Sequence, residues 1–409
     1  MKVAVVGTGI AGLGAAYALS RVHEVELFER ESWAGGHTHT IGHATDGQTL
    51  ALDTGFIVMN ERTYPNLVRL FGELGVATQD SEMSFSVSCA RCGLEYSGRR
   101  LFAQPANALR PRFGRLLADI ARWLREAPGE VAEDVTLDQH AAARGYSRGF
   151  RDHFLVPLTA AIWSSAPGGA LDFPAAYALR FFENHGMLGF RRFGWKTVAG
   201  GSETYVRAIL ERLEGRLELE TEVKAVHRDM DGVTVETSRG GSHRFDGVVV
   251  ATHPDQALRL LADPSDDERR ILGAFRYTAN ETVLHTDERF LPKRRAARAS
   301  WNYQLTDCRA ESSRPTMTYY LNRLQQLDQP VHYCVTLNRG AEISEDRVIA
   351  RMLYEHPQYT FESLRAQAEL ARLNGQRRTS FCGAYHGFGF HEDGLVAGLR
   401  AAEAFGASW

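Results

Sequence analysis

The chain has 409 residues, enough for two or three domains. Hydrophobic residues make up 44% and charged residues 24%, a balance typical of a globular protein with a substantial core. The net charge of −3 argues against nucleic-acid binding, and no apolar run is long enough to span a membrane. The N-terminus lacks the features of a signal peptide and the five cysteines are thinly spread, so we expect a cytoplasmic protein with reduced thiols.

The N-terminal segment predicts a strand, a glycine-rich turn, a helix and a second strand. Residues 2–6 form an apolar run typical of a buried parallel strand, and residues 24–29 have the pattern of the second strand. A helix is expected over residues 10–21. The turn before this helix is Gly7-Thr8-Gly9-Ile10-Ala11-Gly12, a G-x-G-x-x-G motif.

Each glycine of this motif has a mechanical role. Gly7 permits the tight turn, Gly9 lets the backbone approach a pyrophosphate, and Gly12 lets the helix pack against the sheet. The phosphates then lie at the helix N-terminus, near Ile10 and Ala11, where free N–H groups favour an anion. Glu29 ends the second strand about twenty residues further on, where a carboxylate can bind the ribose hydroxyls. The sequence therefore predicts a dinucleotide site.

The rest of the chain alternates between helical and strand-like patterns. We predict helices over 105–126, most of 135–185, 200–213 and 345–373, and strands over 217–226, 232–236, 245–252 and much of 275–340. In the first of these helices, Leu109 belongs to the apolar side and several arginines lie among the apolar residues. The final stretch, 379–409, predicts a strand, an aromatic turn and a helix.

A longer pattern follows the opening motif. Arg30 comes directly after Glu29, and the pair Gly35-Gly36 follows shortly before His37. This order resembles the glutathione-reductase-type FAD folds, especially the flavin amine oxidase and phytoene desaturase branch. The resemblance implies FAD as the cofactor and implies cofactor contacts by Arg30, Gly35, Gly36 and His37.

Further segments resemble the same branch in chain order. They are Leu52-Asp53-Thr54-Gly55-Phe56, Thr221-Glu222-Val223, Val248 to Thr252, Phe381-Cys382-Gly383-Ala384 and Asp393-Gly394-Leu395-Val396-Ala397-Gly398. The resemblance implies that Gly55 and Phe56 pass the flavin ring and that Val223 contacts the adenine. It adds Thr252, Gly383, Ala384, Asp393, Gly394 and Leu395 to the cofactor site. We expect Asp393 to cap the last helix, whose first N–H groups would face the flavin.

The expected fold is α/β, with a Rossmann-type FAD-binding domain interleaved with a mixed α+β substrate domain, as in amine oxidases. We predict a discontinuous FAD-binding domain over 1–75, 195–255 and 375–409. The substrate domain would comprise 76–194 and 256–374, with the flavin ring at the boundary, where ligand pockets commonly form.

Residues 384–394, Ala384 to Gly394, are most similar to bacterial FAD-dependent proteins encoded beside cyclopropane-fatty-acid-synthase-like methyltransferases. This resemblance implies hydride abstraction from a lipid acyl chain, as in desaturation, and a methyltransferase as a partner. Tyr385 and His386 are the catalytic candidates, because the aromatic segment precedes the last helix and some of it should face the flavin.

Three alternatives remain open: oxidation of a small amine, double-bond isomerisation, and a non-catalytic role as a flavin-binding partner of a methyltransferase. Many amine oxidases place a lysine near the flavin in the second substrate-domain segment. The only lysine between residues 256 and 374 is Lys293, in the charged run Lys293-Arg294-Arg295. This departure favours a dehydrogenase, desaturase or isomerase over an oxidase.

Three other patterns contain residues that could bind a metal or a lipid. Cys89-Ala90-Arg91-Cys92 is a C-x-x-C, but the sequence has no second pair to complete a zinc site, so we predict a hairpin tip and no metal. The histidines His37, His39 and His43 lack an acid or cysteine that would complete a metal site. The arginines of residues 99–125, with Phe113 and Trp123, could form a basic surface against anionic lipids, so a peripheral membrane contact stays open.

Overall fold

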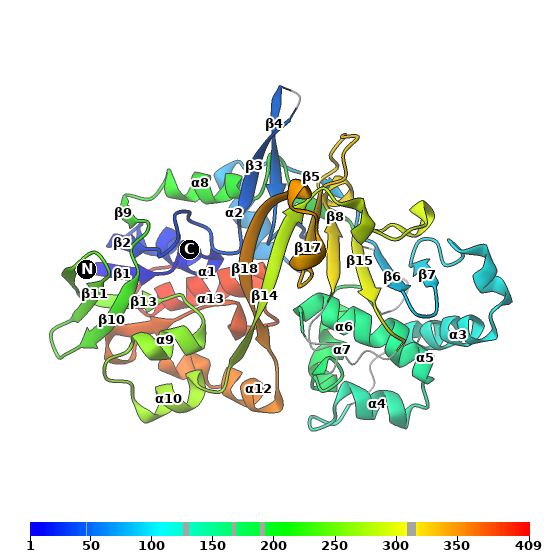
Figure 1. The fold of residues 1–409 in the computed structure, drawn as a ribbon. Coiled ribbons are helices and arrows are strands. Elements are labelled where there is room, and N and C mark those ends of the chain that lie inside the picture. Colours follow the sequence, from blue (N-terminus) through cyan, green and yellow to red (C-terminus); the bar gives the residue numbers. More distant parts are fainter. Residues whose placement is uncertain (46, 126–130, 166–168, 189–192, 309–315) are drawn as a thin grey trace.

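The structure is a computed structural model that describes the chain except for residue 46 and the segments 126–130, 166–168, 189–192 and 309–315. Parts of two predicted helical regions, residues 126 and 166–168, therefore lie outside the described residues. Two sheets dominate the fold (Figure 1). A parallel sheet lies beside both chain termini, and a larger mixed sheet separates it from a layer of helices. None of the described helices has the length and apolar character needed to cross a bilayer.

The five-stranded parallel sheet has the order β19-β13-β1-β2-β9. Its strands are β1 (Lys2–Val6), β2 (Glu24–Phe28), β9 (Gly215–Glu218), β13 (Gly247–Val250) and β19 (Thr379–Phe381). Alternate residues of β1 lie on opposite faces of the sheet. Val3 and Val5 pack with helix α1 (Ile10–Leu19) on one face, and Ala4 and Val6 pack with a second layer on the other face. A strand buried on both faces explains the continuous apolar run and confirms the predicted Rossmann-type unit.

The opposite layer is a three-stranded antiparallel sheet with two helices. The strands are β10 (Val223–Arg228), β11 (Val233–Thr237) and β12 (Gly241–Phe245), and the helices are α9 (Pro254–Leu260) and α10 (Asp266–Leu272). The single strand predicted over 217–226 is wrong, because it comprises β9 and β10, which belong to different sheets. The chain turns between them at Glu220, which adopts a left-handed φ of 51°.

The seven-stranded sheet has the order β18-β14-β17-β16-β15-β6-β7. Its strands are β6 (Phe85–Cys89), β7 (Leu94–Ser97), β14 (Arg276–His285), β15 (Trp301–Leu305), β16 (Met317–Tyr320), β17 (Cys334–Leu337) and β18 (Val348–Gln358). The prediction of a helix over 345–373 is wrong for its first half. Strand β18 pairs with β14 along nearly its whole length, and this tertiary pairing overrides the helix preference of residues such as Met352 and Leu353. Within this range, helix is confined to two 3-10 turns, Glu345–Arg347 and Leu370–Leu373, and to α12 (Phe361–Gln367).

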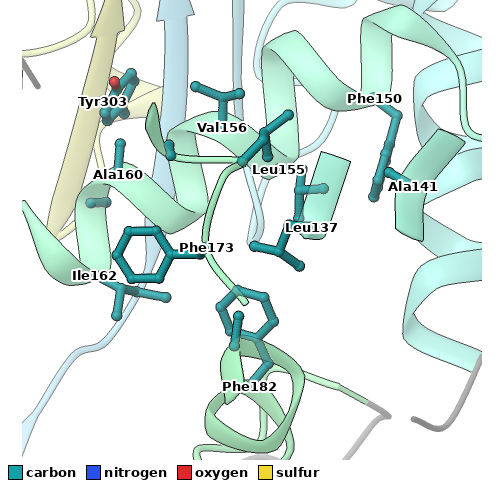
Figure 2. Close-up of a cluster of buried hydrophobic side chains, with 14 of the residues drawn as sticks. Leu137, Ala141, Phe150, Leu155, Val156, Ala160, Ile162, Phe173, Phe182 and Tyr303 are labelled. Carbon is teal, nitrogen blue, oxygen red and sulfur yellow. The ribbon is translucent and has the colours of Figure 1, made fainter. Parts of the chain in front are cut away.

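A layer of helices packs against strands β6, β7 and β15 of this sheet. It contains α3 (Pro111–Arg125), α4 (Leu137–Ala143), α5 (Arg148–Phe150), a π-helical turn (Arg151–Leu155), α6 (Val156–Trp163) and α7 (Ala175–Asn184). Figure 2 shows its core, where Phe150, Phe173 and Phe182 gather with aliphatic side chains beside Tyr303 of β15. Leu109 is not part of the apolar face as we predicted. It belongs to a 3-10 turn, Pro105–Leu109, that precedes α3, and it is 87% exposed.

The remaining elements join the two sheets. They are the hairpin β3 (Thr40–Thr45) and β4 (Gln48–Asp53), the pair β5 (Thr78–Ser81) and β8 (Trp195–Val198), and the helices α2 (Pro65–Leu74), α8 (Glu203–Leu210), α11 (Leu321–Leu324) and α13 (His391–Glu403). Every strand of the parallel sheet comes from the segments predicted for the FAD-binding domain, and every strand of the seven-stranded sheet from those predicted for the substrate domain. We keep that division as a proposal.

Asp53 joins these parts at the end of β4. One of its carboxylate oxygens, Oδ1, accepts hydrogen bonds from Thr40 Oγ1 at 2.6 Å and from the backbone N–H and hydroxyl of Ser202, just before α8. The other, Oδ2, accepts from Gln325 Nε2 at 3.1 Å, and Gln325 Oε1 accepts from the Asp53 N–H. Burial raises the pKa of Asp53 to about 6, against the opposing effect of the hydrogen bonds from Thr40 and Ser202.

This pKa predicts how stability depends on pH. The folded state binds the Asp53 proton more tightly than the unfolded chain does. The stabilisation of the folded state that results is complete below about pH 4 and is lost as the pH rises through about 6. We expect the unfolding free energy of wild type minus that of Asp53→Asn to fall over this range, by at most about 3 kcal/mol. Urea unfolding at a series of pH values measures it. Asp80→Asn, at an exposed site, is the control, and a difference independent of pH would contradict the prediction.

Candidate cofactor and substrate site

The turn between β1 and α1 leaves an open space at the helix N-terminus. Gly9 is the N-cap of α1, and no side chain caps the helix, so its first N–H groups have no intrahelical partner. A Cβ built on Gly9 would meet no atom within 4 Å, whereas one built on Gly12 would lie 1.9 Å from the carbonyl oxygen of Gly7. Gly12 thus serves the packing of helix against turn, and Gly9 faces space that a diphosphate can fill.

Glu29 lies beside this turn, buried at the end of β2. Its Oε2 accepts hydrogen bonds from the backbone N–H and the hydroxyl of Thr8, at 2.9 and 2.6 Å, and its Oε1 accepts from the Glu31 N–H at 3.1 Å. These bonds fix the carboxylate at the position where the motif requires a ribose acceptor. Sequence reasoning did not single out Thr8, because it occupies an unspecified position of the motif.

The second glycine pair closes over the first turn. Gly35 donates its N–H to Thr8 Oγ1 at 3.2 Å, which links the two segments. Gly36 has a left-handed φ of 58°, and a Cβ there would lie 3.1 Å from the Cα of Gly9. The two glycine segments therefore meet backbone to backbone, as the resemblance implied, and both border the open space at the α1 N-terminus.

Helix α13 brings a second N-terminus to the same place. Cβ atoms built on Gly394 and Gly398 would lie 2.8 Å from Ile10 Cγ2 and 2.1 Å from the Ala11 carbonyl oxygen, so glycine is needed for this contact. The prediction that Asp393 is the N-cap is wrong. The helix begins at His391, and Asp393 Oδ2 accepts the backbone N–H of Phe390 at 2.9 Å from within the first turn. The Gly394 N–H is bonded to the Phe390 carbonyl oxygen, so the free N–H groups lie before it.

His37 lies in a cluster of polar rings between the two sheets. Its ring centroid is 4.9 Å from that of Tyr354 and 5.6 Å from that of His356, both on β18, and 6.4 Å from that of His253. Burial, and then the neighbouring His356 and His253, lower the pKa of His37 well below its usual value. Its Nε2 is buried without a hydrogen-bond partner among the described residues, as expected where a ligand completes the site.

Phe56 borders the same region from the segment after β4. Its ring stacks on His391 at a centroid distance of 3.8 Å, and His391 Nε2 lies 2.9 Å from Thr38 Oγ1. Burial lowers the pKa of His391 to about 3, so this imidazole is neutral. Gly55 is needed beside it, because a Cβ there would lie 2.1 Å from the carbonyl oxygen of His37. This arrangement fixes the first residue of α13 against the segment 37–38.

A cavity of about 270 Å³ lies next to the N-terminus of α13. Three separate parts of the chain line it: Arg62, Thr63 and Tyr64; Asn184 and His185; and Phe388, Phe390, Glu392 and Asp393. Glu392 accepts the N–H groups of Asn66 and Leu67, both at 3.0 Å, and so caps the first turn of α2. Sequence reasoning missed Glu392, since its partners are more than 300 positions away; its only signal was the position beside Asp393.

The predicted catalytic residues, Tyr385 and His386, follow strand β19 and lie outside the cavity lining. Tyr385 is buried in the core beneath the parallel sheet, where its ring packs edge-on against Phe275 at 5.3 Å. The Tyr385 hydroxyl and the Nε2 of the adjacent His386 are buried without a partner among the described residues. Burial lowers the pKa of His386 to about 4. Neither residue lines the cavity, and their catalytic roles stay predictions.

The other predicted cofactor residues take different positions. Thr252 lies next to Gly7, and Ala384 lies near Gly394. Leu395 packs its side chain on α1 at Gly14, and Gly383 lies against the Tyr385 ring. Val223 is close to the end of β2, because the Thr221 N–H bonds to the Glu29 carbonyl oxygen. Arg30 instead points outward, with its side chain 57% exposed and paired with Glu31.

These features fit FAD. The N-termini of α1 and α13, the two glycine segments and Glu29 offer donors for a diphosphate and an acceptor for a ribose. The unpartnered Nε2 of His37 adds a polar group at the boundary of the two sheets.

Gly9 separates cofactor binding from folding. Because a methyl group at Gly9 meets no protein atom, we expect Gly9→Ala to fold with an unchanged unfolding midpoint when free of FAD. The same methyl group would occupy the space of the diphosphate, so we expect FAD affinity to fall at least about tenfold, or roughly 1.4 kcal/mol. Fluorescence titration of the apoprotein with FAD measures this. Gly114→Ala, equally unobstructed but on α3, is the control, and unchanged affinity in Gly9→Ala would contradict the assignment.

Comparisons with known proteins agree with this geometry. Among solved structures, the chain is similar to a CLA-producing fatty acid isomerase from P. acnes, with a TM-score of 0.68, 16% identity and coverage of 97% of this chain and 96% of that chain. It is similar to a putrescine oxidase bound to putrescine, with a TM-score of 0.68, 16% identity and 99% coverage of both chains. It is also similar to cyclohexylamine oxidase from Brevibacterium oxydans, with a TM-score of 0.67, 17% identity and 98% coverage of both.

At these identities the three likenesses establish the fold, and a search of curated protein sequences finds no match. The family evidence comes from the sequence itself. The model of the flavin containing amine oxidoreductases matches residues 10–349, which is most of the chain. The protein therefore belongs to the flavin-containing amine oxidoreductase family, and its cofactor is FAD.

Proposed function

We propose that this flavin-dependent oxidoreductase removes hydride from an apolar acyl chain that carries an anionic head group. The observation that carries the proposal is the cavity beside α13, which combines aromatic walls with a cation at its edge. Phe388, Phe390 and Tyr64 provide the aromatic part, and Arg62 provides the positive charge. When FAD is bound, its flavin ring supplies the hydride acceptor.

The carboxylates of the cavity are occupied by the protein's own donors. Glu392 is bonded to the N–H groups of Asn66 and Leu67, and Asp393 to that of Phe390. Burial raises the pKa of Asp393 to about 6, so this carboxylate takes up a proton as the pH falls below neutral. Both acids are therefore engaged by backbone N–H groups, which weakens their attraction for a substrate ammonium group. Arg62 has no carboxylate partner among the described residues, and its guanidinium lies 4.9 Å from the centre of the Phe193 ring.

The aromatic walls are held rigidly by the helical layer. Trp163 Nε1 donates to the Phe388 carbonyl oxygen at 3.1 Å, and the Tyr177 hydroxyl donates to that of Gly387 at 2.7 Å. The Phe390 ring stacks on Phe181 at 4.9 Å. A rigid wall of rings orients an alkyl chain and excludes water, and we assign no general base to the reaction.

The lysine position supports chemistry other than that of an oxidase. Lys293 is exposed in the loop before β15, where its backbone N–H donates to the Glu95 carboxylate of β7, and it does not line the cavity. A lysine that assists oxygen chemistry would have to lie buried near the flavin. We therefore favour a dehydrogenase, a desaturase or an isomerase.

Anaerobic mixing of the FAD-loaded protein with fatty acids or phospholipids tests this proposal. We expect an anionic lipid to bleach the flavin absorbance, and putrescine or a monoamine to leave it unchanged. The Arg62→Ala variant should raise the KM for an anionic lipid at least about tenfold with little change in kcat, because Arg62 contributes binding to a head group. Arg69→Ala, an exposed arginine of α2 that does not line the cavity, is the control. Bleaching by amines but not by lipids would refute the proposal.

Double-bond isomerisation is the second candidate. The first solved structure named above is that of a fatty acid isomerase, and isomerisation uses the same acyl-chain cavity. It returns the hydride to the substrate, so product forms without an electron acceptor. Turnover of an unsaturated fatty acid with the flavin remaining oxidised, and without consumption of oxygen or an added acceptor, distinguishes it from desaturation.

A lipid substrate gives reason to propose a peripheral membrane contact as well. Phe102 and Leu109 are 54% and 87% exposed, and Arg99, Arg100 and Arg112 lie in the same stretch of chain. The aromatic residues Phe113 and Trp123 that we predicted for this surface are buried in the helical core instead. We expect the double substitution Phe102→Ser, Leu109→Ser to reduce sedimentation with anionic vesicles several-fold. Met230→Ser, at an exposed site in the turn between β10 and β11, is the control, and an equal effect of both would contradict the contact.

A further inference from the structure

Four side chains suited to a metal ion meet at one end of the seven-stranded sheet. Cys89, Cys92, Cys308 and His153 place their sulfur and nitrogen ligand atoms within 4.8 Å of one another. From the geometry we propose that these four residues bind one zinc ion in a tetrahedral site that has a structural role. The sequence prediction of no metal considered only a second cysteine pair, whereas here a single cysteine and a histidine complete the set.

The sheet explains why the first three ligands meet. Strands β6 and β15 are parallel, and Cys89 pairs in register with Leu305, so both strands end at the same edge. The chain then turns at Cys89–Cys92, closed by a hydrogen bond from the Gly93 N–H to the Cys89 carbonyl oxygen. Cys308 follows Leu305 by one short turn. An ion pair between Arg91 and Asp307, at 2.6 Å, holds the two turns together.

The helical layer supplies the fourth ligand. His153 lies in the π-helical turn Arg151–Leu155, and π turns occur frequently at functional sites. Phe150 and Leu155, on either side of it, are fully buried in the core that Figure 2 shows. The Tyr96 hydroxyl of β7 also donates to the His153 carbonyl oxygen at 2.7 Å. The histidine backbone is therefore fixed on both sides, and its ring is left to face the cysteines.

The distances match a zinc site better than a disulfide. Zinc–sulfur bonds of about 2.3 Å at tetrahedral angles place two sulfur atoms about 3.8 Å apart, and zinc–nitrogen bonds of about 2.0 Å give slightly shorter sulfur–nitrogen distances. The Cys89 and Cys308 sulfurs are 3.8 Å apart, and the Cys92 sulfur is 3.8 Å from His153 Nε2. A disulfide requires about 2.05 Å, and all five cysteines are free.

The ligand set also defines the kind of metal site. Three thiolates and one imidazole in a tetrahedral arrangement select zinc among the common divalent ions, and four protein ligands leave no position for substrate. Cys92 is exposed, so an ion can reach the site from solvent. The site lies near strands β6 and β7, at the opposite edge of the sheet from β18, which contacts the cofactor region (Figure 1). It therefore fastens the sheet to the helical layer and takes no part in flavin chemistry.

The first test measures metal in the FAD-loaded full-length protein, purified with zinc and without exposure to air. We expect one zinc ion per chain by elemental mass spectrometry. Protein loaded with cobalt(II) instead should show the intense long-wavelength absorption of a tetrahedral thiolate site, beyond the flavin bands. A zinc-free protein in which all five thiols react with a thiol reagent after denaturation would overturn the proposal. So would a disulfide between Cys89 and either Cys92 or Cys308.

The second test uses variants. Cys92→Ser and His153→Gln should each weaken zinc binding by more than about 100-fold in competition with a chelator, because even residues that only support a ligand contribute about 10–100-fold. Both variants should retain FAD, which separates this site from the cofactor site. Cys334→Ala and His332→Gln, outside the cluster, are the matched controls. Undiminished zinc in both ligand variants would overturn the proposal, and the cobalt spectrum of the unmodified protein decides the question if a variant fails to fold.

Discussion

The structure depends on the close packing of α1 against α13. Glycines at 14, 394 and 398 remove the side chains that would hold these helices apart, and Leu395 fills the contact. This packing places two helix N-termini at one space, although one begins at Ile10 and the other at His391. The free N–H groups at both helix ends favour an anionic ligand in this space, as the diphosphate of FAD requires. The polar rings and the cavity are arranged around it.

Local patterns were sufficient to predict the first strand–helix–strand unit of the fold. The apolar run of β1, the glycine motif and Glu29 determine structure within about thirty residues, where backbone conformation and the nearest neighbours decide the outcome. Local patterns predicted a helix where β18 lies, because Met352, Leu353 and Glu355 suit a helix and only pairing with β14 makes them a strand. The predicted start of α13 is also too late, since a capping carboxylate lies equally well inside the first turn.

The substrate half required contacts that no local pattern contains. His253 and His356 come to His37 from distant parts of the chain, and Glu392 caps a helix more than 300 residues earlier. The cysteine pair illustrates the same limit. Cys89 and Cys92 predicted a hairpin tip correctly, yet Cys308 joins them only because β6 and β15 are parallel neighbours. Spacing along the sequence cannot show which strand lies beside which.

The order of strands in the parallel sheet has a consequence for biosynthesis. Its edge strand β19 and the helix α13 come from residues 379–403, whereas β1 and α1 come from the first twenty. A nascent chain therefore exposes the first glycine turn long before the helix that covers it has been made. Residues 391–403 must be made before α13 can pack on α1, so the apolar surface of α1 that α13 covers has to be shielded until then.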